Sequence, residues 1–586
     1  MKKIINAPET LVREMCSGLV LAHPSLEFNS KHKVIQKKQL NPDKVTLISG
    51  GGSGHEPAHA GFVGKGMLDA AVCGDIFASP SQIQIYQAIR STAGQKGTLL
   101  VIKNYSGDMM NFKNAAFLAG EDGIEVDYVK VDDDIAVEDS LYTVGKRGVA
   151  GTVLVHKIAG AAAERGLPLA EVKKAAEKAI ANIRSIGFAF TSCTVPAKGT
   201  PTFQLEDNEM EYGVGIHGEP GIRREPIVTA DELAARMVAA LLESLGADGT
   251  AAREVTVLVN GFGATPLQEL YLLGNSVIRE LDAKQVTVHN VLVGNFMTSI
   301  DMAGASLSLM KLDDELKSLL ADECHTPALV LQGPFEPVQY TEVIQQPETE
   351  QEVSFKCDTD AAYAKVTGNT FTLNNLIYAI DKMSEIIIEN EVPFCELDAH
   401  AGDGDFGMSV AKGFKQLKTE WKDIMQNHAA DTGSFLDACS LIIMEHCGGA
   451  SGPIWGSAFR AAGKYAGDRS GLSMAELAEM LEAVVKGIQD TGERAFGRGA
   501  VVGDKTLIDA LVPYAQSWKD SAAQGDDFST ASAKAAAAAV EGARQTGDIV
   551  ARMGRAGTVG ERSLGYPDAG AYALGVIFTG LSEAMQ

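Results

Sequence analysis

Residues 45–57 read VTLISGGGSGHEP, a β-branched apolar run followed directly by a turn with four glycines and a histidine. Such a run is typical of a buried strand, and glycines at the carboxyl end of a parallel strand leave backbone N–H groups open to a ligand. Similar strand patterns recur at 98–104, 255–260, 286–293 and 327–333. Between them, residues 169–186 and 229–246 have the 3.6-residue apolar period of amphipathic helices. This alternation predicts an α/β fold with a largely parallel sheet.

The pattern changes after residue 336. Residues 337–369 are polar and acidic and predict a linker. Helical periods then dominate at 374–390, 434–447, 474–490 and 531–553. We therefore expect an α/β domain over 1–336, with subdomains of about 1–190 and 191–336, and an all-α domain over 370–586.

Length and charge restrict the class of protein. A chain of 586 residues is too long for one core, so at least two domains are expected. The formal net charge of −25 argues against nucleic acid and anionic membranes as partners, because both are polyanions. No apolar run approaches the roughly 18 residues of a membrane span. The eight scattered cysteines indicate reduced thiols, and with a start unlike a secretory signal they favour the cytoplasm.

Two loops after predicted strands carry candidate chemistry. The Gly52–His55 loop follows the first strand, and KNYSGD, from Lys103 to Asp108, ends the second. Loops from one edge of a sheet converge, which would bring His55, Lys103 and Asp108 together. Asp108 could then accept a proton from a substrate hydroxyl. Aspartate is also a good helix cap, and that alternative stays open.

A third loop, GVGIHGEPG at 213–221, surrounds His217 with four glycines. Small neighbours let a ligand approach the imidazole closely. A neutral imidazole nitrogen is nucleophilic enough to add to an activated ketone. The alternative is an exposed turn histidine.

The sharpest local signal is LDAHAGDGDFG at 397–407, in which Asp398, Asp403 and Asp405 crowd into one glycine-rich turn. Like charges so close together repel, and a cation relieves the repulsion. Carboxylates that leave positions for phosphate oxygens suit Mg²⁺. A solvated acidic turn is the alternative explanation.

Further glycine-rich breaks at 447–453, 503–506 and 554–563 interrupt the helical half. Backbone amides at helix starts bind phosphate, and Arg555 or Arg562 could add positive charge. Together with the aspartates, these breaks predict a nucleotide pocket.

These motifs coincide with those of a known family. The whole chain resembles the single-chain, ATP-dependent dihydroxyacetone (glycerone) kinases. The resemblance rests on motifs that occur in order along both halves: SGGGSGHEPAHAGFVG, KNYSGDMMNF, GVAGTVLVHKIAGA, GIHGEPG, GDGDFG, GGASGPIWGSAF, GDKTLIDAL and SLGYPDAGA.

The resemblance implies phosphorylation of dihydroxyacetone to dihydroxyacetone phosphate, with Mg-ATP as phosphate donor and glyceraldehyde as a second substrate. His217 would hold the ketone as a covalent hemiaminal, and Asp108, assisted by His55, would be the base. The implied substrate contacts are Gly52, Ser53, Gly54, His55, Lys103 and Asp108. The trio Asp398, Asp403 and Asp405 would hold two Mg²⁺ ions. The implied nucleotide contacts are Gly407, Met408, Ser409, Val410, Ala450, Ser451, Thr506, Arg555, Asp568, Ala569 and Gly570.

The resemblance also implies an eight-helix barrel for the C-terminal half and a homodimer. Phe406 departs from the family pattern, because many relatives have a polar residue there; we still expect activity, since the three carboxylates are intact. Three rival functions remain: transfer of phosphate from a phosphoprotein, a non-catalytic sugar-sensing protein, and cyclising lyase activity on FAD.

Overall fold

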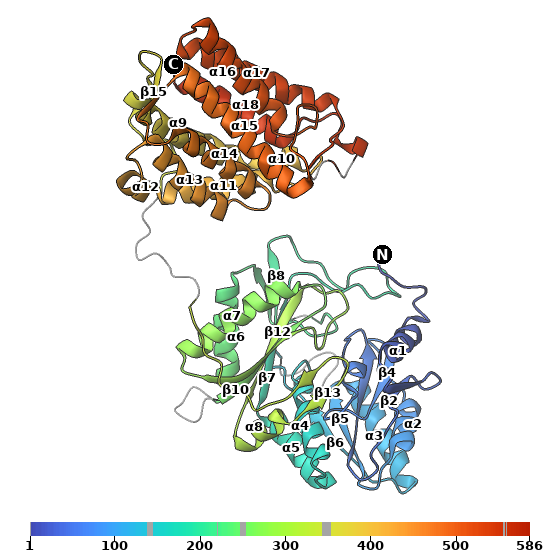
Figure 1. Ribbon diagram of the computed structural model, residues 1–586. Helices are drawn as coiled ribbons and strands as arrows, with labels where there is room; N and C mark the ends of the chain where they lie inside the picture. The colour runs from blue at the N-terminus through green and yellow to red at the C-terminus, as the bar shows by residue number, and fades with distance from the viewer. Residues whose placement is uncertain are drawn as a thin grey trace. The chain divides into compact units, whose positions relative to one another are not determined.

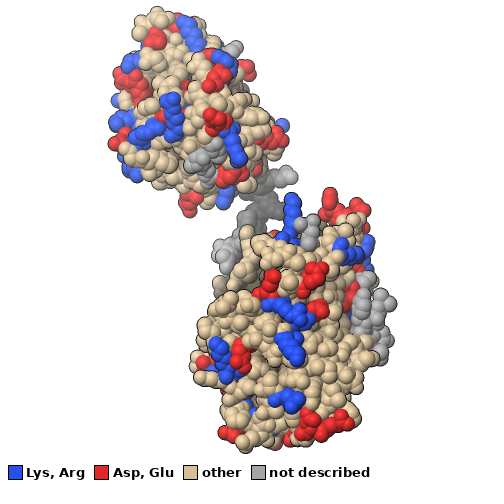
Figure 2. All heavy atoms as spheres, turned by 90° about the vertical axis from the view of Figure 1, so that its right-hand side faces the viewer, with Lys and Arg blue, Asp and Glu red and all other residues tan. Residues whose placement is uncertain are grey.

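The computed structural model describes residues 2–137, 145–219, 221–246, 254–342, 353–554, 557 and 560–585. The chain forms two compact units, Met1–Gln345 and Gln346–Gln586, coloured blue to green and yellow to red in Figure 1. None of the helices in the described ranges is long and apolar enough to cross a membrane. On the face shown in Figure 2, Lys and Arg side chains are interspersed with Asp and Glu on both units.

The first sheet of the N-terminal unit has six strands in the order β1-β2-β4-β3-β5-β6. Their bounds are β1 (Leu26–Asn29), β2 (Val34–Lys37), β3 (Thr46–Ser53), β4 (Ala70–Ile76), β5 (Thr98–Lys103) and β6 (Val126–Val131). The four strands from β3 to β6 are parallel, and all residues of β3 and β5 are buried, which explains the apolar runs in the first half of β3 and along β5.

Helices cover both faces of this sheet. α2 (Gln82–Thr92) and α3 (Ser106–Glu121) share one apolar cluster with the strands, and α4 (Thr152–Glu164) and α5 (Leu169–Ala181) share another. A further helix, α1 (Leu11–Ala22), packs on β1 and β4. The first subdomain therefore has the predicted α/β fold with a largely parallel sheet, arranged in three layers.

The second sheet has the order β11-β10-β12-β7-β8-β9. Its strands are β7 (Ile183–Ala189), β8 (Glu209–Tyr212), β9 (Arg223–Pro226), β10 (Glu254–Gly261), β11 (Thr287–Gly294) and β12 (Gly304–Lys311). Only β10 and β11 pair in parallel; the other pairs are antiparallel. The prediction of a largely parallel sheet is wrong here, because an apolar run does not indicate strand direction.

The helices of this subdomain are α6 (Ala230–Ser244), α7 (Leu267–Ala283) and α8 (Asp314–Ala321). The capping box of α6 is confirmed, since Thr229 and Glu232 exchange side-chain and backbone hydrogen bonds. Two boundaries were wrong. The helix predicted over 169–186 ends at Ala181, and β7 follows after one residue. Of the strand predicted over 327–333, only β14 (Val330–Leu331) forms, paired with β13 (Cys324–His325).

The C-terminal unit is helical, with one short ribbon of β15 (Thr370–Thr372) and β16 (Gly471–Ser473). The bounds of its helices are α9 (Leu373–Glu389), α10 (Glu391–Asp398), α11 (Phe406–Thr419), α12 (Trp421–Asn427), α13 (Thr432–His446), α14 (Ser451–Ala466), α15 (Met474–Phe496), α16 (Ile508–Gln524), α17 (Phe528–Gln545) and α18 (Ala569–Ala584).

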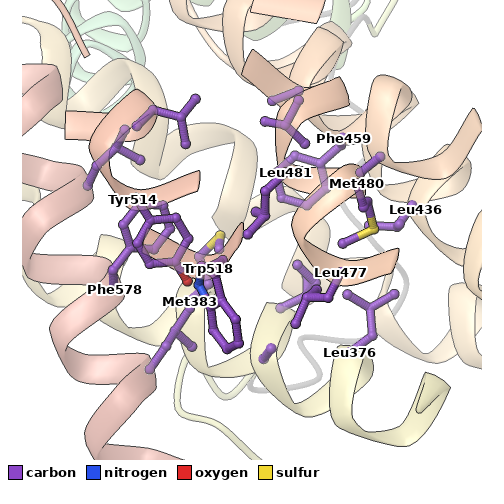
Figure 3. Close-up of a pocket in the computed structure, with 18 of the residues that line it drawn as sticks. Leu376, Met383, Leu436, Phe459, Leu477, Met480, Leu481, Tyr514, Trp518 and Phe578 are labelled. Atoms are coloured by element: carbon purple, nitrogen blue, oxygen red, sulfur yellow. The ribbon is translucent and has the colours of Figure 1, made fainter. Parts of the chain in front are cut away.

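Eight of the helices described in this unit are long and form a closed ring. In the ring, α9 contacts α11, α11 contacts α13, each helix from α13 to α18 contacts the next, and α18 returns to α9. The interior is lined by apolar side chains from around the ring, among them Leu376, Leu436, Leu477, Trp518 and Phe578 (Figure 3). The expected eight-helix barrel is confirmed.

Part of the stretch 337–369 packs on the barrel, while residues 343–352 lie outside the described ranges. The backbone N–H of Thr359 donates to the buried carboxylate of Asp381 on α9, and Asn375 donates to the carbonyl of Tyr363. Asp381 also pairs with Lys418 of α11. Residues 358–365 therefore belong to the helical unit.

Candidate active site

The glycine-rich end of β3 and the end of β5 lie side by side, because the two strands are parallel neighbours. A Cβ atom at Gly51 would lie 3.3 Å from Lys103 Nζ and 3.5 Å from an Asp108 oxygen, so both side chains reach the turn. A Cβ at Gly52 would lie 2.8 Å from the Phe77 backbone. Glycine at position 51 lets two charged side chains approach the backbone, and glycine at position 52 leaves room for the neighbouring backbone at Phe77.

Lys103 and Asp108 are buried groups of opposite charge, 1% and 3% exposed. Burial lowers the pKa of Lys103 and raises that of Asp108, and the attraction between them opposes both shifts. The Ser79 hydroxyl donates a hydrogen bond to Asp108. Asp108 lies in the first turn of α3, whose N-cap residue is Tyr105, so it is not the helix cap. A carboxylate with a raised pKa is well suited to accept a proton from a hydroxyl.

His217, from the loop between β8 and β9, reaches the same place. Its Nε2 lies 3.1 Å from Nε2 of His55, 162 positions away in the chain. The rings of Phe77 and Tyr105 stand edge-on to it, with centroid distances of 5.0 and 4.6 Å. The His217 side chain is 18% exposed, so it is an enclosed imidazole rather than an exposed turn histidine.

Hydrogen bonds determine where the two imidazoles carry protons. His55 Nδ1 lies 2.8 Å from the carbonyl oxygen of Thr298, and His217 Nδ1 lies 2.9 Å from a carboxylate oxygen of Glu219. Because both partners only accept, both Nδ1 atoms carry hydrogen. The facing Nε2 atoms then share one proton, since two lone pairs at 3.1 Å would repel. Burial and then the charge of Lys103 lower the pKa of His55 well below its ordinary range.

Two other predicted contacts hold the turn itself. The Ser53 hydroxyl donates to the carbonyl of Gly74 at 2.8 Å. Gly54 has φ +105°, and its N–H donates to the Glu56 carboxylate at 2.8 Å. The structure thus brings His55, Lys103 and Asp108 to the Gly52–Gly54 turn, as the loop argument predicted, and it adds His217, which that argument did not place there.

In the helical unit, Asp398, Asp403 and Asp405 surround the turn between α10 and α11. One carboxylate oxygen from each lies within 4.8 Å of the other two. Asp398 also accepts a hydrogen bond from the N–H of Gly404 at 2.9 Å, which orients its carboxylate. Three hard oxygen donors at this spacing fit a divalent cation such as Mg²⁺ that keeps water or phosphate among its ligands.

A cleft opens beside the aspartates. Its lining includes Asp398, Gly402, Phe406, Ala450, Ser451, Lys505, Thr506, Asp568, Ala569 and Gly570. The helices α14 and α18 begin at this lining, and helix N-termini attract phosphate through their free N–H groups and dipole. The predicted contacts from α14, α18 and the loop at 506 therefore converge on the aspartates.

Two charged groups shape the cleft. Lys505 donates to the carbonyls of Ile549 and Tyr566, at 3.2 and 2.8 Å, and to that of Ser563, which ties down the segment before α18. Burial raises the pKa of Asp568 to about 7, with nearby carboxylates adding to the shift and Lys505 opposing it.

The predicted contacts on the first turn of α11 do not line this cleft: Gly407, Met408, Ser409 and Val410. Val410 is buried in the barrel core, and Met408 is exposed. The carbonyl of Ser409 accepts a hydrogen bond from Gly448, so it touches the loop before α14. Arg555 lies outside the described residues.

Comparison with known proteins assigns the family. Residues 17–328 match the Dak1 domain, and residues 400–583 match the DAK2 domain. The chain belongs to the dihydroxyacetone kinase family. It is a single-chain member, since the Dak1 and DAK2 domains follow each other in one polypeptide.

Three similar proteins illustrate the likeness. The L-erythrulose 1-kinase of Mycolicibacterium smegmatis is 35% identical over 592 residues, which is 100% of this chain and 99% of the relative. The dihydroxyacetone-binding subunit DhaK of a PTS-dependent kinase from Listeria innocua is 52% identical over 54% of this chain and 95% of its own length. The crystal structure of the C. freundii dihydroxyacetone kinase with AMP-PNP and Mg²⁺ is 30% identical, with a TM-score of 0.61 and 99% coverage of both chains.

Sequence reasoning missed four residues of the site: Ser79, Tyr105, Glu219 and Thr298. Ser79 and Thr298 could not be found, because their contacts join segments far apart in the chain. Glu219 was visible two positions after His217 in the glycine-rich loop, and a carboxylate so near a candidate histidine is a usable signal.

Proposed function

We propose that this protein uses Mg-ATP to phosphorylate a small hydroxyketone, with dihydroxyacetone the leading substrate and glyceraldehyde a second one. The observation that carries the proposal is the meeting of His217 with His55, Lys103 and Asp108 in an enclosed site. A nucleophilic nitrogen, a proton donor and a base stand together where a polyol kinase would need only hydroxyl contacts.

In the proposed reaction, His217 Nε2 adds to the substrate carbonyl and holds it as a hemiaminal. Glycerol has no carbonyl, so this adduct separates ketone from polyol. Lys103 and the N–H groups of the Gly52–Gly54 turn bind substrate oxygens. Asp108 takes the proton of the hydroxyl that receives the phosphoryl group, which its raised pKa supports.

In the helical unit, Asp398, Asp403 and Asp405 would hold Mg²⁺, in our proposal two ions. The metal, when bound, supplies positive charge to the ATP phosphates. The N-termini of α14 and α18 receive the phosphates, and Thr506 and the Asp568–Gly570 turn contact the nucleotide. The related structure with AMP-PNP and Mg²⁺ supports this assignment. We further propose a homodimer, which sedimentation of the full chain tests directly.

Two relatives favour specific alternatives. The Listeria relative is a subunit of a PTS-dependent system, which keeps phosphate transfer from a phosphoprotein as a second candidate. The M. smegmatis relative acts on erythrulose, which extends the substrate class to four carbons. A non-catalytic sugar sensor is disfavoured, because His217 and all three aspartates are present.

The test is an assay of ADP formation with dihydroxyacetone, glyceraldehyde, erythrulose and glycerol offered separately, for wild type and His217→Ala. We expect turnover with the carbonyl compounds, negligible turnover with glycerol, and weaker discrimination in the variant. Equal rates with glycerol and dihydroxyacetone would contradict the adduct. Phosphate transfer without ATP, or product from FAD, would identify the rival activities.

A further inference from the structure

Both carboxylate oxygens of Glu219 accept hydrogen bonds from His217. One oxygen lies 2.9 Å from His217 Nδ1, and the other accepts the His217 backbone N–H, also at 2.9 Å. The Glu219 side chain is only 4% exposed. Burial alone would raise the pKa of Glu219, but the charge and hydrogen bonds of His217, with the charge of Arg147, lower it to about 2. The carboxylate is therefore ionised.

Arg147 lies close to Glu219, and other groups hold its side chain in place. Its side chain is fully buried, and it donates to Asp134 at 2.7 Å and to the Gly213 carbonyl at 2.8 Å. A Cβ at Gly215 would lie 2.1 Å from Glu219 Oε2 and 2.6 Å from Arg147 Nη1. Because Gly215 has no side chain, the Glu219 carboxylate and the Arg147 guanidinium can both lie close to its Cα atom.

We propose that Glu219, with the charge of Arg147 nearby, is a positioning residue that fixes His217 in the Nδ1–H tautomer and neutralises the imidazolium charge as the carbonyl adduct forms. The inference rests on the proposed function, since it assigns a partner to the histidine of that reaction. A buried carboxylate that orients a catalytic imidazole and balances its charge is a recurring arrangement.

The step balances without any added reagent. With the shared proton on His55 Nε2, the lone pair of His217 Nε2 forms a bond to the carbonyl carbon. The π pair of the carbonyl becomes an alkoxide, which takes the proton from His55 and becomes the hemiaminal hydroxyl. His217 becomes an imidazolium as the bond forms, and its Nδ1–H stays bonded to Glu219 throughout.

The groups that face His217 are His55 from the turn after β3, Asp108 and Tyr105 from the β5–α3 segment, and Glu219 from its own loop; Lys103 lies behind Tyr105. Asp108 favours and Lys103 disfavours a proton on the His55–His217 pair. Removing the Glu219 charge loosens that proton, so the high-pH limb of the rate profile should move to lower pH.

The experiment compares Glu219→Gln with a matched control, Glu211→Gln. Glu211 is also buried at 5% exposure and braces the same loop by accepting from Gly221 at 2.8 Å and Arg224 at 3.0 Å, without touching His217. The adduct is followed by the NMR signal of the ¹³C-labelled carbonyl of dihydroxyacetone, turnover by ADP formation, and nucleotide binding by Mg-ADP titration.

For Glu219→Gln we expect kcat/KM for dihydroxyacetone to fall about 10²–10³-fold, as expected for loss of a tautomer-fixing carboxylate. Adduct should decrease, the high-pH limb should shift downward, and Mg-ADP binding should stay unchanged. Glu211→Gln should resemble wild type. Adduct and pH profile like wild type in Glu219→Gln would overturn the role of Glu219 alone. A wild type without adduct or ketone-dependent ADP would overturn the proposed function with it.

A measurement on the wild type covers the case in which Glu219→Gln does not fold. The ¹⁵N spectrum of labelled histidines, with the His217 signals identified by their absence from His217→Asn, reports the tautomer directly. A protonated Nδ1 in the free protein supports the inference, and an unprotonated Nδ1 overturns it.

Discussion

The two candidate sites are built in opposite ways. In the α/β unit, His55, Lys103 and Asp108 are buried, and strand ends, a glycine turn and backbone carbonyls set their positions. In the helical unit, Asp403 is exposed, and like charges face one another at the cleft. The first site has its geometry before any ligand arrives. The second is a set of acceptors and helix ends that a cation and phosphates would complete, so substitutions in the two units should fail differently.

The largest expected effect is the loss of one metal ligand. Asp403→Asn should lower ATP-dependent turnover about 10³-fold, since metal charge stabilisation is worth several kcal/mol. The fold should be unaffected because Asp403 is exposed, and the ketone adduct in the α/β unit should form as in wild type. ADP formation measures the loss of turnover, and the ¹³C adduct signal shows whether the ketone adduct still forms. Asp423→Asn, at an exposed position on α12, is the control; an equal loss there would refute the metal role.

Removal of the buried base should be the next largest. Asp108→Asn should reduce kcat about 10²–10³-fold, the usual range for a general base. The KM for ATP should not change, because the proposed nucleotide cleft lies in the other unit. Steady-state kinetics with each substrate varied separately distinguish this from Asp403→Asn, in which the Mg²⁺ dependence should change. A raised KM for ATP with an unchanged kcat would argue that Asp108 is no base.

Burial should also make the α/β unit sensitive to acid. Burial lowers the pKa of His156 to about 3 and that of His59 well below its ordinary value. Below pH 6.5 these histidines bind protons in the unfolded chain but stay neutral in the folded unit. The free energy of unfolding is therefore highest above pH 6.5 and falls as the pH drops toward 3. At pH 5 each histidine should lower the free energy of unfolding by about 2 kcal/mol.

Urea unfolding at pH 7 and pH 5 measures this effect. All three tryptophans, Trp421, Trp455 and Trp518, lie in the helical unit, so their fluorescence reports that unit alone while circular dichroism reports both. At pH 5 the dichroism transition should begin at lower urea than the fluorescence transition. His156→Asn should show less of this pH dependence. If the two transitions coincide at both pH values, the predicted acid sensitivity of the α/β unit is wrong.

The sequence predicted local chemistry better than direction and long-range contact. The glycine turn before His55, the glycines around His217 and the aspartate trio could be recognised because each feature lies within a few adjacent residues. The antiparallel second sheet could not, since apolar runs look alike in either direction. β7 was merged into the preceding helix because a single residue, Asn182, separates them. The 3.1 Å contact between His55 and His217 spans 162 positions, and only the fold provides it.

The smallest expected effect concerns Phe406, the residue that departs from the family pattern beside the aspartates. Its ring lies 6.1 Å from that of Phe394 and packs against the barrel core, so its role in this chain is apolar contact. Phe406→His should lower stability by about 1 kcal/mol through lost packing. It should change kcat by less than about threefold, a difference under 1 kcal/mol, because the three carboxylates remain. Thermal unfolding and a Mg²⁺ titration of turnover test both parts. A large gain in Mg²⁺ affinity would mean that this position reaches the metal, and the cleft would then hold a fourth ligand position that the phenylalanine blocks.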